Sequence, residues 1–253
     1  MNSFAIACAA FAFILGGTLA GMLIGRVLPG HHLSGDSKEA IKQGLALLAL
    51  LTALVLGLLV GTTKGTFDAQ SATVREVAAN VAVLDRALDR YGPQTKEARK
   101  SLADVAKAML EHMWPESSGQ QADLTADAVR LAGEDMFDKI TALEPETDTQ
   151  RLLKSRALEM TISLAQTRQR LLAQKESSIP MPFLVVLGFW LTILFGCYGL
   201  LAPRNLTVFV VLIVCMVSVA GALFLVLEMD RPFDGIVRVP SAPLQSVLSR
   251  LGQ

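Results

Sequence analysis

The sequence predicts an all-α integral membrane protein, with four transmembrane helices and a helical domain inserted between the second and the third. Of its 253 residues, 52% are hydrophobic and only 18% are charged, a composition too apolar for a soluble domain of this size. Four segments are long enough to cross a bilayer, which takes about 20 helical residues. They are residues 4–28, 41–63, 181–201 and 206–227. No stretch alternates apolar and polar residues as a half-buried strand does.

These spans divide the chain into four regions. Residues 1–66 hold the first two spans, residues 67–178 form the inserted domain, residues 179–229 form a hairpin of two spans, and residues 230–253 form a C-terminal tail. The first apolar segment lacks a basic start and is longer than the apolar core of a secretory signal. We therefore interpret it as a retained span.

A single long helix over residues 37–91 organises the rest of the chain. Residues 45–60 are almost all Leu, Ala and Val without a charge, which predicts a location in lipid. The chain leaves the bilayer at residues 61–66, where Lys64 reaches the headgroups. Beyond that point apolar residues recur every three or four positions, as in a helix packed against another in water. They are Val74, Val77, Val81, Leu84, Leu88 and Tyr91.

Proline residues mark the ends of three further helices in the inserted domain. They are predicted over residues 95–113, 124–143 and 147–172, because proline removes a backbone donor and disfavours helical geometry in the residue before it. The apolar residues of the tail between Ser241 and Leu251 predict a short amphipathic helix. We expect this helix to dock on the inserted domain.

Glycines recur at four-residue intervals on the first two spans, at Gly17, Gly21 and Gly25 and again at Gly57, Gly61 and Gly65. Such a face lets another helix approach closely. Because lipid provides no hydrophobic driving force for helix association, close packing at such faces is where membrane helices gain contacts. We expect these two spans to pack on each other or on a neighbouring subunit. The alternative is that glycine is simply common in membrane helices.

A charged cluster follows the fourth span and consists of Glu228, Asp230, Arg231 and Asp234. In the structural interpretation, proline ends the helix and Arg231 pairs with a neighbouring carboxylate. In the functional interpretation, the charges form a ring at the mouth of an oligomer and tune ion entry. The carboxylates are too few for a calcium site, which takes about six to eight oxygens.

No catalytic constellation or cofactor motif is present, so the sequence predicts neither an enzyme nor a bound cofactor. His31 and His32 lack further ligands nearby, and we expect no metal site. The cysteines Cys8, Cys197 and Cys215 lie in apolar segments and are interpreted as core residues. The zero net charge and the lack of a basic stripe argue against nucleic acid as a partner.

An even number of spans puts both termini and the inserted domain on the same side of the membrane. Basic residues near the membrane decide which side is cytoplasmic. On the domain side they are Lys64, Arg75, Arg168, Arg170, Lys175, Arg231 and Arg238, and on the other side Arg26, Lys38, Lys42 and Arg204. The larger set favours a cytoplasmic domain, although the smaller set lies in shorter loops, which weigh more.

The chain resembles a family of bacterial and plant membrane proteins whose domain is labelled bestrophin-like. The resemblance covers nearly the whole chain. Its most specific part is the run Leu227-Glu-Met-Asp-Arg-Pro-Phe-Asp-Gly, followed by Val237-Arg-Val and Pro243-Leu244. Bestrophins are pentameric anion channels with four spans and cytosolic helices, and their second span lines the pore. The resemblance implies a bestrophin-like fold, a homo-oligomer, inorganic ions as partners, and a cytoplasmic domain at a bacterial inner membrane.

With this resemblance, one face of the second span becomes a candidate pore lining that gates by dewetting. It consists of Leu48, Leu51, Val55, Leu58 and Thr62. The span lacks the aromatic side chains of a bestrophin neck, and the calcium clasp of bestrophins is not carried over. Two alternatives stay open: this face contacts lipid or the bundle core, or the protein is a membrane scaffold or sensor whose helical domain binds a partner.

Overall fold

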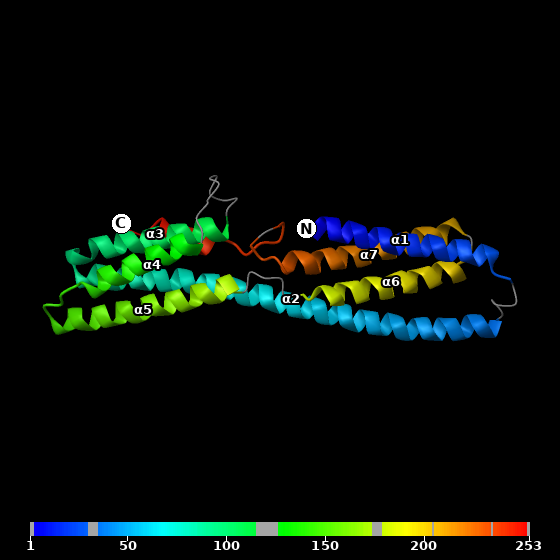
Figure 1. The fold of residues 1–253 in the computed structure, drawn as a ribbon, viewed down its shortest axis with the longest axis horizontal. Helices are drawn as coiled ribbons and strands as arrows, with labels where there is room; N and C mark the ends of the chain where they lie inside the picture. Colours follow the sequence, from blue (N-terminus) through cyan, green and yellow to red (C-terminus); the bar gives the residue numbers. More distant parts are fainter. Residues whose placement is uncertain are drawn as a thin grey trace. The chain divides into compact units, whose positions relative to one another are not determined.

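The computed structural model describes residues 3–29, 35–114, 126–173, 179–203, 205–233 and 235–251, which are helical almost throughout and contain no strand (Figure 1). The elements are α1 (Ser3–Val27), α2 (Gly35–Tyr91), the 3-10 turn η2 (Pro93–Thr95), α3 (Lys96–Met113), α4 (Ala126–Thr141), α5 (Asp148–Ala173), α6 (Met181–Leu201), α7 (Leu206–Met229) and α8 (Ala242–Leu248). In this part of the chain, α1, α2, α6 and α7 are long and apolar enough to cross a bilayer. The predicted all-α membrane architecture is confirmed.

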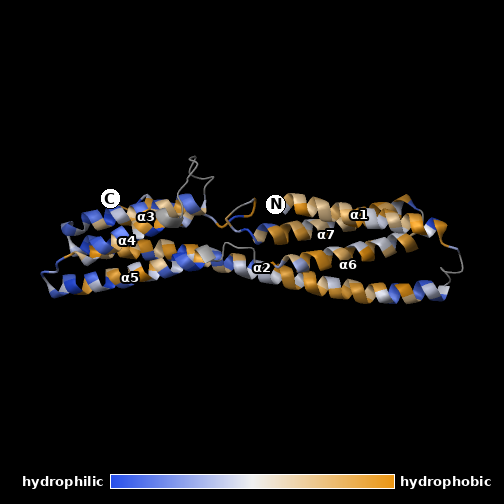
Figure 2. Ribbon diagram, in the orientation of Figure 1, coloured by the Kyte–Doolittle hydropathy of each residue, from blue (hydrophilic) through white to orange (hydrophobic). Residues whose placement is uncertain are grey.

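The chain folds as two compact units. The first, which we call the membrane unit, comprises Met1–Thr66, Ser177–Arg231 and Gly235–Val237. The second, which we call the helical domain, comprises Phe67–Glu176, Pro232–Asp234 and Arg238–Gln253. Helix α2 is continuous and contributes its first half to one unit and its second half to the other. Apolar residues dominate the helices of the membrane unit, whereas those of the helical domain mix apolar and polar residues (Figure 2).

In the membrane unit, α1 packs along α6 and α7. Ile14, Leu187 and Met216 are fully buried where these helices meet. Thr18 is also buried, and its hydroxyl donates to the carbonyl oxygen of Ile14 at 2.9 Å, so this hydroxyl is satisfied within its own helix. The outward faces carry large exposed apolar side chains such as Phe13, as expected for surfaces covered by hydrocarbon.

The helical domain is built around the second half of α2. Its predicted seam of three-four spaced apolar residues is at most 3% exposed and lies in one core with residues of α3, α4 and α5. The seam ends at a turn in which Gly92 has a φ of 131°, a conformation that L side chains rarely adopt. The hydroxyl of Thr95 closes this turn by donating to the carbonyl oxygen of Leu88 at 2.7 Å.

Polar side chains tie α3 to its neighbours. Arg99 bonds Asp85 through Nε at 2.7 Å and Asp89 through Nη1 at 2.8 Å, and the Asp85 hydrogen bond raises the pKa of the guanidinium. Ser101, which is buried, donates to Asp135 Oδ2 at 2.6 Å, and Lys139 Nζ donates to the Ser101 hydroxyl at 2.7 Å. These contacts fix α2, α3 and α4 in one register.

The tail docks on the helical domain, as expected. Leu244 of α8 is 1% exposed and belongs to the core of the domain, where α8 packs on α3. The indole Nε1 of Trp114 donates to the carbonyl oxygen of Val239 at 2.9 Å. The Trp114 ring also contacts Phe233 edge to face, with centroids 5.5 Å apart. These contacts hold the segment after the fourth span.

Candidate functional site

The membrane half of α2 is the candidate site, and it has two different faces. One face is covered by the membrane unit: Leu45, Thr52, Leu59 and Thr63 are at most 9% exposed. The hydroxyls of Thr52 and Thr63 donate to carbonyl oxygens of their own helix, at 2.7 Å to Leu48 and 2.7 Å to Leu59. This face therefore packs without an unmet hydroxyl.

The opposite face of α2 is uncovered within one chain. Leu47, Leu50 and Leu54 are 66%, 68% and 69% exposed. Gly57, Gly61 and Gly65 continue this face, and no described atom would lie within 4 Å of a Cβ placed on any of them. The result is a long apolar surface that becomes smooth where the helix leaves the membrane unit.

The candidate pore-lining residues lie along the edge between these two faces. Leu51 and Leu58 are 49% and 66% exposed, and Thr62 is exposed as well. Leu48 and Val55 are half-buried and pack against the core of the membrane unit. The structure thus leaves three of the five candidates open and uses the other two partly for packing.

The glycines of the first span face the third span, where we expected the second span or a neighbouring subunit. A Cβ on Gly21 would collide with the carbonyl oxygen of Gly196, and one on Gly25 would lie 3.0 Å from that of Leu200. Gly17 meets Thr192 in the same way. The α6 side of this contact could not be predicted from the sequence, because Gly196 and Gly199 are three residues apart and show no four-residue repeat.

The charged cluster at the C-terminal end of α7 is organised around Glu228, not around Arg231. Glu228 is 4% exposed, and its carboxylate accepts a hydrogen bond from the backbone N–H of Ile236 at 2.6 Å. Gly235 lies against this carboxylate and has a φ of 101°, so both the backbone conformation and the space require glycine there. Arg231 is exposed. Asp234 lies outside the described residues.

The described residues contain no group of three or more His, Cys, Asp or Glu side chains that could hold a metal ion. His31 and His32 lie outside them. All three cysteines are free thiols, with Cys8 and Cys215 exposed on the apolar helices. Those two cysteines were interpreted as core residues, and their exposed positions show that this interpretation was wrong for a single chain.

Comparison with known proteins gives a family and a fold. The sequence profile of a family described as bestrophin-like domain matches residues 12–244. Crystal structures of a bacterial bestrophin homologue from Klebsiella pneumoniae are similar to this chain. One has a TM-score of 0.67 and 14% sequence identity, and the match covers 94% of this chain and 97% of that chain. A single-substitution variant has a TM-score of 0.64 and 15% identity, and its match covers 95% of this chain and 99% of that chain. A crystal structure described as a membrane protein variant has 0.69 at 14% over 94% and 95%. No curated protein sequence matches this one significantly.

Proposed function

Because the chain belongs to the bestrophin-like family, we propose that it assembles into a homo-oligomer whose subunits surround an ion pathway lined by α2. By likeness to bestrophins, the conducted ions are inorganic anions. The observation that carries the proposal is the uncovered face of α2, in which a row of exposed leucines continues into a glycine stripe. A glycine stripe that nothing covers is where a helix of another subunit gains packing contacts.

The edge position of the candidate lining suits a ring of subunits. Leu51, Leu58 and Thr62 are exposed in the single chain and would face the axis of such a ring, while Leu48 and Val55 pack partly on the subunit's own core. No charged residue occurs between Leu45 and Thr63, so the span offers neither a fixed charge nor a proton relay. A narrow apolar lining of this kind gates by dewetting, and hydration of the leucine ring opens it.

Chloride flux into liposomes tests this proposal. Wild-type protein should carry chloride, and Leu58→Asn should raise the flux because an amide hydrates an apolar constriction. Leu225→Asn is the matched control, since Leu225 on α7 is also a strongly exposed leucine, at 52%. Electron microscopy of the purified particle should show a closed ring around an axis. Folded oligomer without flux of any tested ion, or equal flux in both variants, would refute an α2 pore.

The exposed position of Arg231 bears on the interpretation of the charged cluster as a ring at the pore mouth. Since its side chain is exposed, Arg231→Ala should leave the protein folded and oligomeric. In a ring at the mouth of the pore, the same change lowers anion entry. An unchanged chloride flux in folded Arg231→Ala protein would remove Arg231 from the pathway.

We further propose that the helical domain and both termini face the cytoplasm, at the inner membrane of a bacterium. The larger count of basic residues on the domain side supports this orientation. Alkaline phosphatase fused after Gln253 should be inactive if the orientation is right. An active fusion would reverse it without affecting the channel proposal.

The alternative of a scaffold or sensor has lost the feature that favoured it. The seam from Val74 to Tyr91 is buried in the core of its own domain, so it is not free to bind a partner helix. A monomer in detergent that retains a soluble partner would revive this alternative.

A further inference from the structure

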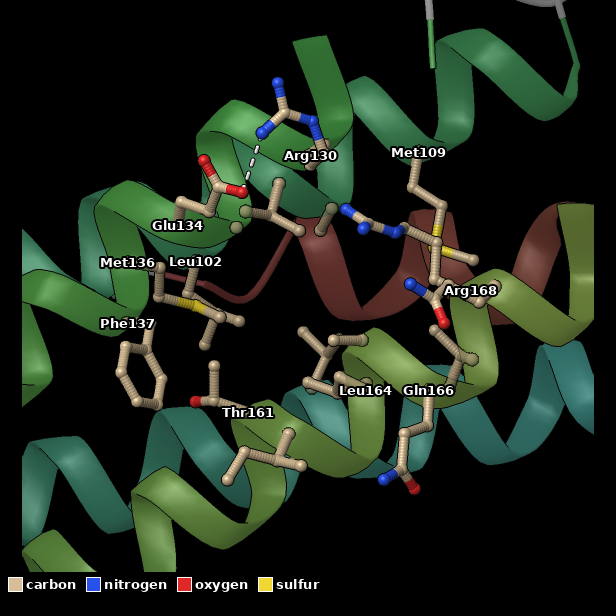
Figure 3. A pocket seen from close by; sticks show the side chains of 18 of the residues that line it. Leu102, Met109, Arg130, Glu134, Met136, Phe137, Thr161, Leu164, Gln166 and Arg168 are labelled. Atoms are coloured by element: carbon tan, nitrogen blue, oxygen red, sulfur yellow. Dashed lines mark hydrogen bonds and ion pairs between the residues drawn. The ribbon is translucent and has the colours of Figure 1, made fainter. Parts of the chain in front are cut away.

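The helical domain contains a cavity of about 400 Å³, partly open to its surface, that the channel proposal does not use (Figure 3). It lies among α3, α4, α5, α8 and the second half of α2, all within this unit. Most of its lining is apolar, including Leu102, Met109, Met136, Phe137 and Leu164. Cavities of about 300–1,000 Å³ with an apolar lining and a few polar groups are typical of small-molecule sites.

Arg168 of α5 gives this cavity a polar end. Figure 3 shows Arg168 on the side of Met109, with Met136 and Phe137 on the opposite side. Its Nη1 donates to the carbonyl oxygen of Val129 at 2.9 Å. Its Nε is buried and has no hydrogen-bond partner among the described residues. Because the guanidinium that lines this cavity is not fully satisfied by the protein, an anionic group that pairs with it forms a strong, charge-assisted hydrogen bond.

The other charged side chains of the lining differ from Arg168 in their ion pairing. Arg130 is engaged by Glu134 at 2.7 Å, whereas no described carboxylate lies within ion-pair distance of Arg168. Glu134 and Asp138 also line the cavity and would repel a ligand with several negative charges. The site therefore favours one negative charge attached to an apolar body.

We propose that this cavity binds a single-chain amphiphile with one anionic head group, of the fatty-acid class. Its carboxylate pairs with the guanidinium of Arg168, and its alkyl chain lies along Leu102, Met136 and Phe137. A free inorganic anion would leave the apolar volume empty, and an uncharged chain would leave the Arg168 guanidinium without an anionic partner. This proposal does not depend on whether the protein conducts ions.

The test uses the full chain in lipid nanodiscs and a dodecanoic acid that carries a photoreactive diazirine at its methyl end. After illumination, mass spectrometry should find the label on the peptides that carry Met136 and Phe137. Unlabelled dodecanoate should displace the probe, whereas dodecanol, phosphatidylglycerol and chloride should not. Displacement by phosphatidylglycerol at the same concentration would assign the site to a bilayer lipid and overturn the proposal, as would label confined to the spans.

Two variants with matched controls test where the carboxylate and the alkyl chain of the ligand bind. Arg168→Met should weaken labelling at least about tenfold, the loss expected for a charge-assisted hydrogen bond. Arg170→Met removes the same charge from an exposed position outside the cavity and should change nothing. Ala165→Phe should fill the cavity and abolish labelling, unlike Ser163→Phe on the exposed, non-lining side of α5. Equal labelling within either pair, or cavity residues that cross-link between two copies of the chain, would overturn the proposal.

Discussion

Replacing Gly235 by alanine tests how the segment after α7 is held. An alanine must adopt the φ of 101°, and left-handed geometry costs an L-residue about 1–2 kcal/mol. Its Cβ would also collide with Oε2 of Glu228, so the carboxylate must move and release the N–H of Ile236. A hydrogen bond to a charged group contributes about 1.5–3 kcal/mol. The free energy of unfolding should therefore fall by about 2.5–5 kcal/mol.

Thermal unfolding of the purified protein in detergent, followed by circular dichroism, measures this loss. For a chain of this length the midpoint should fall by roughly 5–20 °C. Gly221→Ala is the matched control, because Gly221 lies within α7 with open space around it, and alanine there should leave the midpoint equal or slightly higher. A Gly235→Ala midpoint within about 2 °C of wild type would refute this account of Glu228.

Three further predictions concern packing and charge. Gly21→Leu should lower the free energy of unfolding by several kcal/mol, more than the roughly 1–3 kcal/mol of ordinary overpacking, because the new side chain meets the α6 backbone. Gly16→Leu is the control and should be tolerated, since the space around Gly16 is open. Equal midpoints of thermal unfolding for the two variants would contradict this prediction. Hydrogen bonds from Lys139 and Ser101 lower the pKa of Asp135 below its ordinary value of 3.8. The carboxylate therefore contributes its full stabilisation above that pH, and this stabilisation is lost as the pH falls through the lowered pKa. Asp135→Asn should flatten the curve of stability against pH in that acid range, and an unchanged curve would disprove the contribution of Asp135. Burial and the nearby Glu146 and Glu144 raise the pKa of Tyr91 above 10.0, and the Tyr91 hydroxyl has no hydrogen-bond partner in the described part of the chain. Tyr91→Phe should therefore raise the free energy of unfolding by about 1 kcal/mol and remove a loss of stability above pH 10. A lower midpoint of thermal unfolding in this variant would show that the hydroxyl is hydrogen-bonded.

The helices of the domain could be predicted because their ends carry unambiguous residues. Expected helices over residues 95–113, 124–143 and 147–172 compare with Lys96–Met113, Ala126–Thr141 and Asp148–Ala173 in the structure. Proline bounds each of them, and the seam of α2 carries apolar residues against a polar background. In the described part of the chain the predicted bounds agree with the structure to within two residues, and residues 124 and 125 of the predicted second helix lie outside that part.

The faces of the membrane helices could not be predicted in the same way. Leucine and valine cover both sides of α2 in its membrane half, so no polar contrast marks the side that packs on the membrane unit. The burial of Glu228 was missed for a related reason: in sequence it belongs to a charged cluster typical of a surface turn. Only the positive φ of Gly235 and the backbone N–H of Ile236 distinguish it, and neither can be read from residue types.

The spacing of the buried residues along α2 changes where the helix passes from the membrane unit to the helical domain. In the membrane half, positions that are buried or packed on the core follow a three-four alternation from Leu45 through Ala49, Thr52, Leu56 and Leu59. In the domain the alternation resumes from Gln70 to Tyr91. Between them, the spacings from Leu56 to Leu59, Thr63 and Phe67 are three, four and four residues. Together they make one eleven-residue step, which locally unwinds a seven-residue repeat. An uninterrupted seven-residue repeat would drift around a straight helix, and the eleven-residue step offsets that drift at the point where α2 leaves the membrane unit.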